Sequence, residues 1–125
     1  MQRQTSALVL VLVVAMGAFA ASGDGSWLQK VPAKDRERAN PLATHPDAVP
    51  GGAKLYGRHC AQCHGEKGEG TKGRPDLHSE RVRNATPGEL EWLIRNGSMK
   101  NGMPSWSSLP EPQRWQIVSY LKSLK

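Results

Sequence analysis

The chain has 125 residues, which is the usual size of one domain, and no segment repeats at the period of a solenoid. Hydrophobic residues make up 38% of it, but many lie before residue 22, so the rest has little core material and favours an additional stabilising device. The formal net charge is +6 and its basic residues form no dense cluster, which argues against a nucleic-acid partner and favours acidic protein surfaces.

Residues 1–21 have the pattern of a signal peptide or an N-terminal anchor. Arg3 precedes an apolar run from Ala7 to Ala21, and Ala18 and Ala20 supply the small residues that a signal peptidase recognises. The run is shorter than a membrane-spanning helix requires, which favours cleavage over an uncleaved tether. We therefore expect an exported, periplasmic protein, either soluble or tethered to the outer face of the membrane.

Residues 22–49 read as an irregular leader. They contain several prolines and a charged run at 34–38, with little hydrophobic periodicity. Trp27 either packs back onto the domain or belongs to a disordered segment, and the sequence does not decide between these two interpretations. The remaining residues, 50–125, form the predicted domain.

The pattern of residues 50–125 is helical. We predict a short helix over 50–63, a capped helix that begins at Thr86 and ends near Gly97, and a C-terminal helix from Glu111. Residues 64–85 are rich in Gly, Lys and Arg and read as a long loop, which in a small domain suggests that the loop wraps a ligand. No segment alternates for long enough to predict a sheet, so the expected fold class is all-α.

Cys60, Cys63 and His64 form a CxxCH motif, the attachment site for c-type haem. Thiols three residues apart lie on one side of a helical turn, where they can add across the two vinyl groups of a porphyrin. The next residue then directs its imidazole at the iron. One covalently attached haem c per chain is the expected cofactor.

Two other interpretations of the cysteines are weaker. A disulfide or thioredoxin-like redox pair needs a strand-rich setting that this sequence lacks. A structural zinc site needs a fourth ligand, and the available histidines are poorly placed, because His59 is too near in sequence while His45 and His78 lie in expected loops.

A low-spin haem carrier needs a second axial ligand, and a thioether favours ferrous iron. Met103 is the preferred candidate because Gly102 permits close approach of the backbone and Pro104 stiffens the turn. Met99 follows the end of the central helix and reads as a loop or packing residue. His78 remains the candidate for a bis-histidine site.

The chain resembles a class I monohaem cytochrome c from about Gly51 to Leu124. The residues that carry this resemblance are GAKLYGRHCAQCHG, a PDL segment, the capped central helix, GMPSW and the final WQIVSYLKSL. The resemblance implies a small cytochrome c fold of three to four short helices wrapped around one covalently bound haem. It also implies that Tyr56 meets Tyr120 where the first and last helices cross.

By the same resemblance, His64 and Met103 are the metal ligands. The carbonyl of Pro75 accepts a hydrogen bond from the proximal imidazole, and Leu77 packs on the haem edge. Trp106, three residues after Met103, is either a wall of the haem pocket or an ordinary core aromatic residue.

These residues predict a one-electron carrier and not an enzyme, because both axial positions of the iron would be filled. The expected partners are redox proteins, with a dehydrogenase or membrane complex as donor and an oxidase or reductase as acceptor. Lys67, Lys72, Arg74 and Lys100 form either a basic docking face or part of a generally solvated basic surface, and the sequence does not decide between the two. The alternatives are a peroxidase or gas-binding cytochrome with a labile sixth site, and a dedicated subunit of a larger complex attached through the leader.

Overall fold

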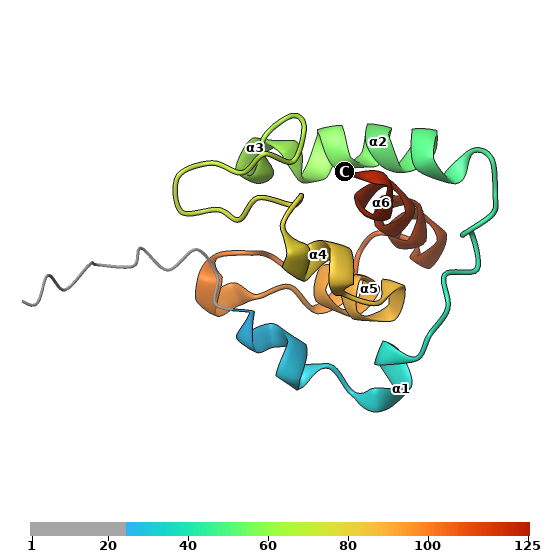
Figure 1. The fold of residues 1–125 in the computed structure, drawn as a ribbon, viewed down its shortest axis with the longest axis horizontal. Helices are drawn as coiled ribbons and strands as arrows, with labels where there is room; N and C mark the ends of the chain where they lie inside the picture. Colours follow the sequence, from blue (N-terminus) through green and yellow to red (C-terminus); the bar gives the residue numbers. More distant parts are fainter. Residues whose placement is uncertain (1–24) are drawn as a thin grey trace, which may run out of the picture.

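Helices joined by ordered loops make up the part of the chain that the structure describes, residues 25–125 (Figure 1). In this computed structural model the helices are η1 (Ser26–Lys30), α1 (Ala33–Arg36), α2 (Ala48–His59), α3 (Ala61–His64), α4 (Glu80–Asn84), α5 (Pro87–Asn96), η2 (Met99–Asn101) and α6 (Glu111–Ser123). Over residues 25–125 there is no strand, and two isolated β-bridges are the only extended pairing. The all-α class is confirmed, with six α-helices in this range instead of three to four.

Helices α2 and α6 cross at close range and form the centre of the core (Figure 1). Gly52 makes this possible, because a Cβ at this position would lie 1.9 Å from the backbone oxygen of Gln116. Beside the crossing, the rings of Tyr56 and Tyr120 pack with their centroids 5.0 Å apart. The contact implied for these two tyrosines is therefore present in the structure.

The hydrophobic side chains at the crossing are almost completely removed from solvent. Tyr56 and Ile117 are 1% exposed, and Val118 is 0% exposed. Burying a side chain of this size stabilises the fold by about 1.5–3 kcal/mol relative to leaving it in water. This crossing therefore supplies a large part of the core and fixes the end of α2, which leads into the cysteine motif.

Helix α5 begins and ends where its sequence predicts. The Thr86 hydroxyl accepts a hydrogen bond from the Glu89 amide at 3.1 Å, and the Glu89 carboxylate accepts one from the Thr86 amide at 2.8 Å. The helix ends at Asn96 and is followed by the capping residue Gly97, whose φ of 70° suits glycine. Leu90 and Ile94 face the core from this helix.

Two segments differ from the sequence prediction near the cysteines. The helix predicted over 50–63 is divided at Cys60 into α2 and α3. The loop predicted over 64–85 contains the short helix α4, which buries Val82 against the core. One buried side chain in a single turn produces no periodicity along the sequence, so the pattern could not reveal α4.

The leader is more regular than the sequence predicts. Residues 25–47 contain η1 and α1, bury Val31 and pack Leu28 against the core. The Arg36 carbonyl accepts a hydrogen bond from the Thr86 hydroxyl at 2.8 Å, so this segment lies against the start of α5. The expectation of an irregular leader over 22–49 thus needs correction from residue 25 onward, because distant contacts order a segment whose local pattern is irregular; residues 22–24 lie outside the described residues.

A buried charged cluster joins the leader to α5 and α6. Glu91 is 0% exposed, and its carboxylate contacts Arg114 at 2.8 Å and Arg38 at 3.2 Å. Arg95 lies 3.2 Å from the same carboxylate and 2.6 Å from the buried Asp35 of α1. A buried carboxylate without such partners would be costly, so the three guanidinium groups are what allow Glu91 to be placed here.

A search of residues 25–125 finds no helix that is both long and apolar enough to cross a membrane. The predicted signal peptide or anchor over 1–21 lies outside the described residues.

Candidate functional site

The cysteine motif forms a single turn at the end of the α2 segment. The amide of Cys63 donates a hydrogen bond to the Cys60 carbonyl at 3.2 Å, and the amide of His64 donates to the same carbonyl at 3.0 Å. Both cysteines are free thiols, and all three side chains are half-buried. Burial, followed by the charge of Cys63, raises the pKa of Cys60 to about 11, so this thiol is protonated at neutral pH.

The imidazole of His64 is oriented by a backbone carbonyl. Its Nδ1 lies 3.2 Å from the Pro75 oxygen, as expected if Nδ1 carries the proton and donates it. Burial lowers the pKa of His64; the Pro75 contact opposes this shift, and the charge of Arg74 adds to it. A neutral ring with its Nδ1 proton engaged leaves Nε2 with a lone pair, which is the form that binds a metal.

The loop after His64 folds back on itself through glycines. The Tyr56 hydroxyl donates to the Gly65 carbonyl at 2.6 Å, and the Gly70 amide donates to the His64 carbonyl at 2.7 Å. Gly70 has a φ of 81°, and a Cβ there would lie 2.8 Å from the Arg74 carbonyl, so the turn requires glycine. The loop therefore returns the chain to the side of His64.

Leu77 and Thr71 complete this return. The Leu77 amide donates to the Gly68 carbonyl at 2.8 Å, and the half-buried Leu77 side chain packs at the edge of the core. The Thr71 hydroxyl donates to the Cys63 carbonyl at 2.7 Å, so the far end of the loop is tied to the motif. Thr71 has no sequence signature of its own, and its contact could not be foreseen.

Met103 sits in a closed turn after α5. Ser98 and Met103 form an isolated bridge with two backbone hydrogen bonds, at 2.8 and 3.1 Å, across the turn that contains η2. The Met103 side chain is half-buried, whereas Met99 in the same turn is 72% exposed. Of these two methionines, Met103 is therefore the less exposed.

Trp106 connects this turn to α2 and α5. Its amide donates to the Ile94 carbonyl at 2.9 Å, and its half-buried indole contacts the ring of His59. From the sequence alone, His59 is only a poorly placed candidate zinc ligand. Its position directly before Cys60 was the available signal that it lies beside the site.

His78 is engaged elsewhere. Its Nδ1 and its backbone amide each lie 2.8 Å from an Asp76 carboxylate oxygen. Among residues 25–125 no group of three or more His, Cys, Asp or Glu side chains could hold a metal ion. The geometry around His78 and the cysteines thus gives no support to the zinc interpretation.

The residues that the sequence singles out fit a haem. Two free thiols and a neutral imidazole nitrogen lie on one turn, and a thioether that is not buried in the core lies in the turn that follows α5. All seven predicted site residues are half-buried, as expected for side chains that border a ligand and are not part of a closed core. They are Cys60, Cys63, His64, Pro75, Leu77, Met103 and Trp106.

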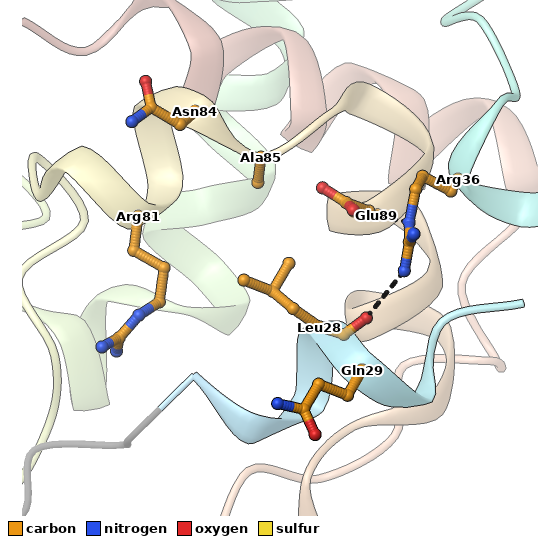
Figure 2. A pocket seen from close by; sticks show the side chains of 7 residues that line it. All are labelled: Leu28, Gln29, Arg36, Arg81, Asn84, Ala85 and Glu89. Carbon is orange, nitrogen blue, oxygen red and sulfur yellow. Dashed lines mark hydrogen bonds and ion pairs between the residues drawn. The ribbon is translucent and has the colours of Figure 1, made fainter. Parts of the chain in front are cut away.

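The two cavities described for the chain lie away from these residues. The larger, about 410 Å³, is bordered by the leader and helices α4 and α5 (Figure 2). Leu28 projects into it between Arg81 and Arg36, and the Arg36 guanidinium donates to the Leu28 carbonyl at 3.1 Å. The smaller cavity, about 200 Å³, lies between Leu42 and Trp115. Residues of the leader line both cavities.

Known proteins that are similar in sequence to this chain include a cytochrome c oxidase subunit and a cytochrome c. The sequence model described as "Cytochrome C oxidase, cbb3-type, subunit III" matches residues 47–121. The chain is 31% identical over 88 residues to the cbb3-type cytochrome c oxidase subunit CcoP of Rubrivivax gelatinosus, which covers 69% of this chain and 29% of that protein. It is 33% identical over 91 residues to cytochrome c550 of Pseudomonas aeruginosa, which covers 67% of this chain and 61% of that protein.

A similar solved structure is cytochrome cL of the marine methylotroph Methylophaga aminisulfidivorans. The two structures superpose with a TM-score of 0.57 and are 24% identical in sequence. The match covers 66% of this chain and 57% of the cytochrome cL chain. This likeness shows the small cytochrome c fold. The chain spans less than two thirds of the length of each of these three proteins.

Proposed function

Because this chain belongs to the class I monohaem c-type cytochrome family, we propose that it is an exported one-electron carrier with a single covalent haem c. The observation that carries the proposal is the turn formed by Cys60, Cys63 and His64. It presents two free thiols beside an imidazole whose Nδ1 is held 3.2 Å from the Pro75 carbonyl. Bound haem supplies the one-electron couple of its iron.

The chain's own residues attach and orient this group. Cys60 and Cys63 would hold the haem covalently, each through a thioether bond from its sulfur atom. His64 would bind the iron through Nε2, while Pro75 would hold the ring in one orientation and increase its basicity. Leu77 and Trp106 border the group with apolar surface, which limits the access of water.

Met103 is the proposed second axial ligand. Its half-buried thioether and its backbone bridge to Ser98 support this assignment over Met99, which is 72% exposed. The contacts of His78 with Asp76 favour Met103 over a bis-histidine site. With His64 and Met103 bound, no coordination position remains for a substrate, so the proposed role is electron transfer and not catalysis.

The proposed partners are redox proteins with acidic surfaces. Lys72 and Lys100 are exposed and make no ion pair among the described residues, so their charges are directed to solvent. Charges of this kind accelerate association with an oppositely charged partner at low salt. A relative is named as a subunit of a cbb3-type oxidase, which supports a terminal oxidase as one class of acceptor.

Export and location follow the sequence pattern of residues 1–21. We propose a periplasmic protein that is either released or tethered to the outer face of the membrane. Cleavage can be tested by N-terminal sequencing of the protein purified from the periplasm.

A dedicated subunit remains the second candidate, and the leader is the segment that would attach it. In the structure the leader contacts its own domain through Asp35 and Arg95 at 2.6 Å, which favours an internal role. Replacing exposed leader residues such as Lys30 and Lys34 should leave co-purifying proteins unchanged. Loss of a large partner in those variants would favour the subunit.

The test of the proposal is the mass and absorption spectrum of protein matured with haem. The mass should exceed that of the polypeptide by one haem, and the ferric protein should show the sulfur-to-iron charge-transfer band. Met103→Ala should lose this band, whereas Met99→Ala should retain it. A wild-type protein that shows a high-spin spectrum and binds carbon monoxide without displacing a ligand would instead favour the peroxidase or gas-binding alternative.

A further inference from the structure

Arg74 lies in a tight turn that is fixed to the cysteine motif. Its amide donates to the Thr71 carbonyl at 2.9 Å, the two residues form an isolated bridge, and Gly73 has a φ of 79°. Thr71 in turn donates its hydroxyl to the Cys63 carbonyl. The backbone of Arg74 is therefore held in place, immediately before the Pro75 carbonyl that orients His64.

The side chain of Arg74 crosses to the turn that contains Met103. Its Nη1 donates to the Asn101 carbonyl at 3.3 Å, over a separation of 27 residues. At the next residue, a Cβ on Gly102 would lie 3.0 Å from the same Nη1 atom. The hydrogen bond and the close approach thus place the guanidinium directly on this turn.

The turn that receives Arg74 is closed on itself. The Gly102 amide donates to the Met99 carbonyl at 3.0 Å, and Met103 is paired with Ser98. Because these hydrogen bonds link the residues of the turn to one another, a contact at Asn101 also restrains Met103 two residues later. A charge-assisted hydrogen bond to a carbonyl is stronger than a neutral one, although solvent at this half-exposed site reduces its contribution.

From these contacts we infer that Arg74 is a positioning residue that clamps the Met103 turn to the Pro75 segment. It would thereby hold both axial ligands of the proposed haem in register. The inference rests on the proposed function, since it assumes that Met103 is a ligand. It removes Arg74 from the expected docking face, because its guanidinium is engaged within the chain.

The experiment measures how readily the Met103 turn opens in the haem-loaded ferric protein, with no redox partner present. Added imidazole can bind the iron only when Met103 leaves, so its apparent affinity reports the population of the open turn. Arg74→Gln removes the contact with Asn101. We expect the affinity for imidazole to rise about threefold to tenfold, the range that corresponds to the net value of one hydrogen bond.

Lys72→Gln is the matched control, because it removes one positive charge from the same loop at a side chain without a described contact. It should leave the affinity for imidazole unchanged and should weaken only the salt dependence of electron transfer. Arg74→Lys retains the charge and an N–H donor on a differently shaped side chain, so it should bind imidazole with an affinity between those of wild type and Arg74→Gln. Equal affinities in wild type and Arg74→Gln would overturn the clamp.

A second variant tests the same contact from the other side. Gly102→Ala places a methyl group against Nη1 at a φ of 79°, so it should also raise the affinity for imidazole. If Gly102→Ala left the affinity unchanged, the close approach would carry no restraint. If the wild-type protein shows no sulfur-to-iron band, the proposed function is refuted. If the band is present and the variants bind imidazole like the wild type, only the clamp is refuted.

Discussion

The imidazole of His59 packs against the indole of Trp106, with ring centroids 5.0 Å apart and planes inclined by 52°. His59 ends α2 directly before the first cysteine, and Trp106 follows the proposed ligand Met103 by three residues. The pair thus joins the segment that would carry the thioether bonds to the segment that would supply the second ligand.

A double-mutant cycle should detect this pairing. In the haem-loaded protein we expect a coupling free energy of about 0.5–1.5 kcal/mol between His59→Ala and Trp106→Ala, as is usual for aromatic pairs. Urea unfolding measures it. His45→Ala, which removes an exposed imidazole elsewhere, should show no coupling to Trp106→Ala, and additive effects in both cycles would refute the prediction.

Glu91 should be the most sensitive charged position in the chain. Glu91→Gln leaves the guanidinium groups of Arg38, Arg95 and Arg114 without the carboxylate that they share, so we expect a loss of about 3–5 kcal/mol in the free energy of unfolding. Glu111→Gln is the comparison, because its side chain is 49% exposed and the expected loss is below about 1 kcal/mol. A similar loss in the two variants would contradict the prediction.

The crossing of α2 and α6 offers a pair of glycines with opposite expectations. Gly52→Ala would bring a Cβ to 1.9 Å from the Gln116 oxygen, which forces the helices apart and should prevent stable folding. Gly57 lies in the same helix with nothing within 4 Å, so Gly57→Ala should stabilise the protein by about 0.5–1 kcal/mol. Circular dichroism and thermal unfolding separate the two, and a tolerated Gly52→Ala would show that the crossing is looser than described.

The loop beside His64 should show a pH-dependent contribution from Asp76. The backbone amide of His78, and then its ring, hold the pKa of this carboxyl below its ordinary value of 3.8. A depressed pKa means that the contribution to stability is present above the unfolded value and is lost as the pH falls through the folded one. Carbon-detected NMR titration should show that His78→Ala raises the pKa of Asp76 towards the ordinary value. An identical titration in the variant would disprove the role of the ring.

The sequence predicted those elements whose signals are local. Thr86, Pro87 and Glu89 specify the start of α5 within four residues, and the CxxCH motif places the thiols and the imidazole on one turn. The sequence pattern also favours Met103 over Met99 as a ligand, and this stays a prediction. These features depend on neighbours along the chain, which a single sequence displays.

The features that escaped prediction depend on residues far apart in sequence. Arg38 contacts Glu91 across 53 positions of the sequence. Arg74 contacts a backbone carbonyl, and because every residue has one, the sequence does not mark it as a partner. The order of the leader follows from such contacts, and so does the clamp on the Met103 turn. Side-chain type alone does not indicate which distant partner a cation will find.

Tyr56 belongs both to the helix crossing and to the loop beside His64. Its ring is 1% exposed between α2 and α6, and burial raises the pKa of its hydroxyl, which donates to the Gly65 carbonyl at 2.6 Å. Stability and ligand geometry therefore share one side chain and cannot be engineered separately. Replacing Tyr56 with phenylalanine would keep the packing of the ring but would remove the hydrogen bond to the backbone next to His64. Variants of the α2–α6 crossing should therefore be designed together with the loop after His64.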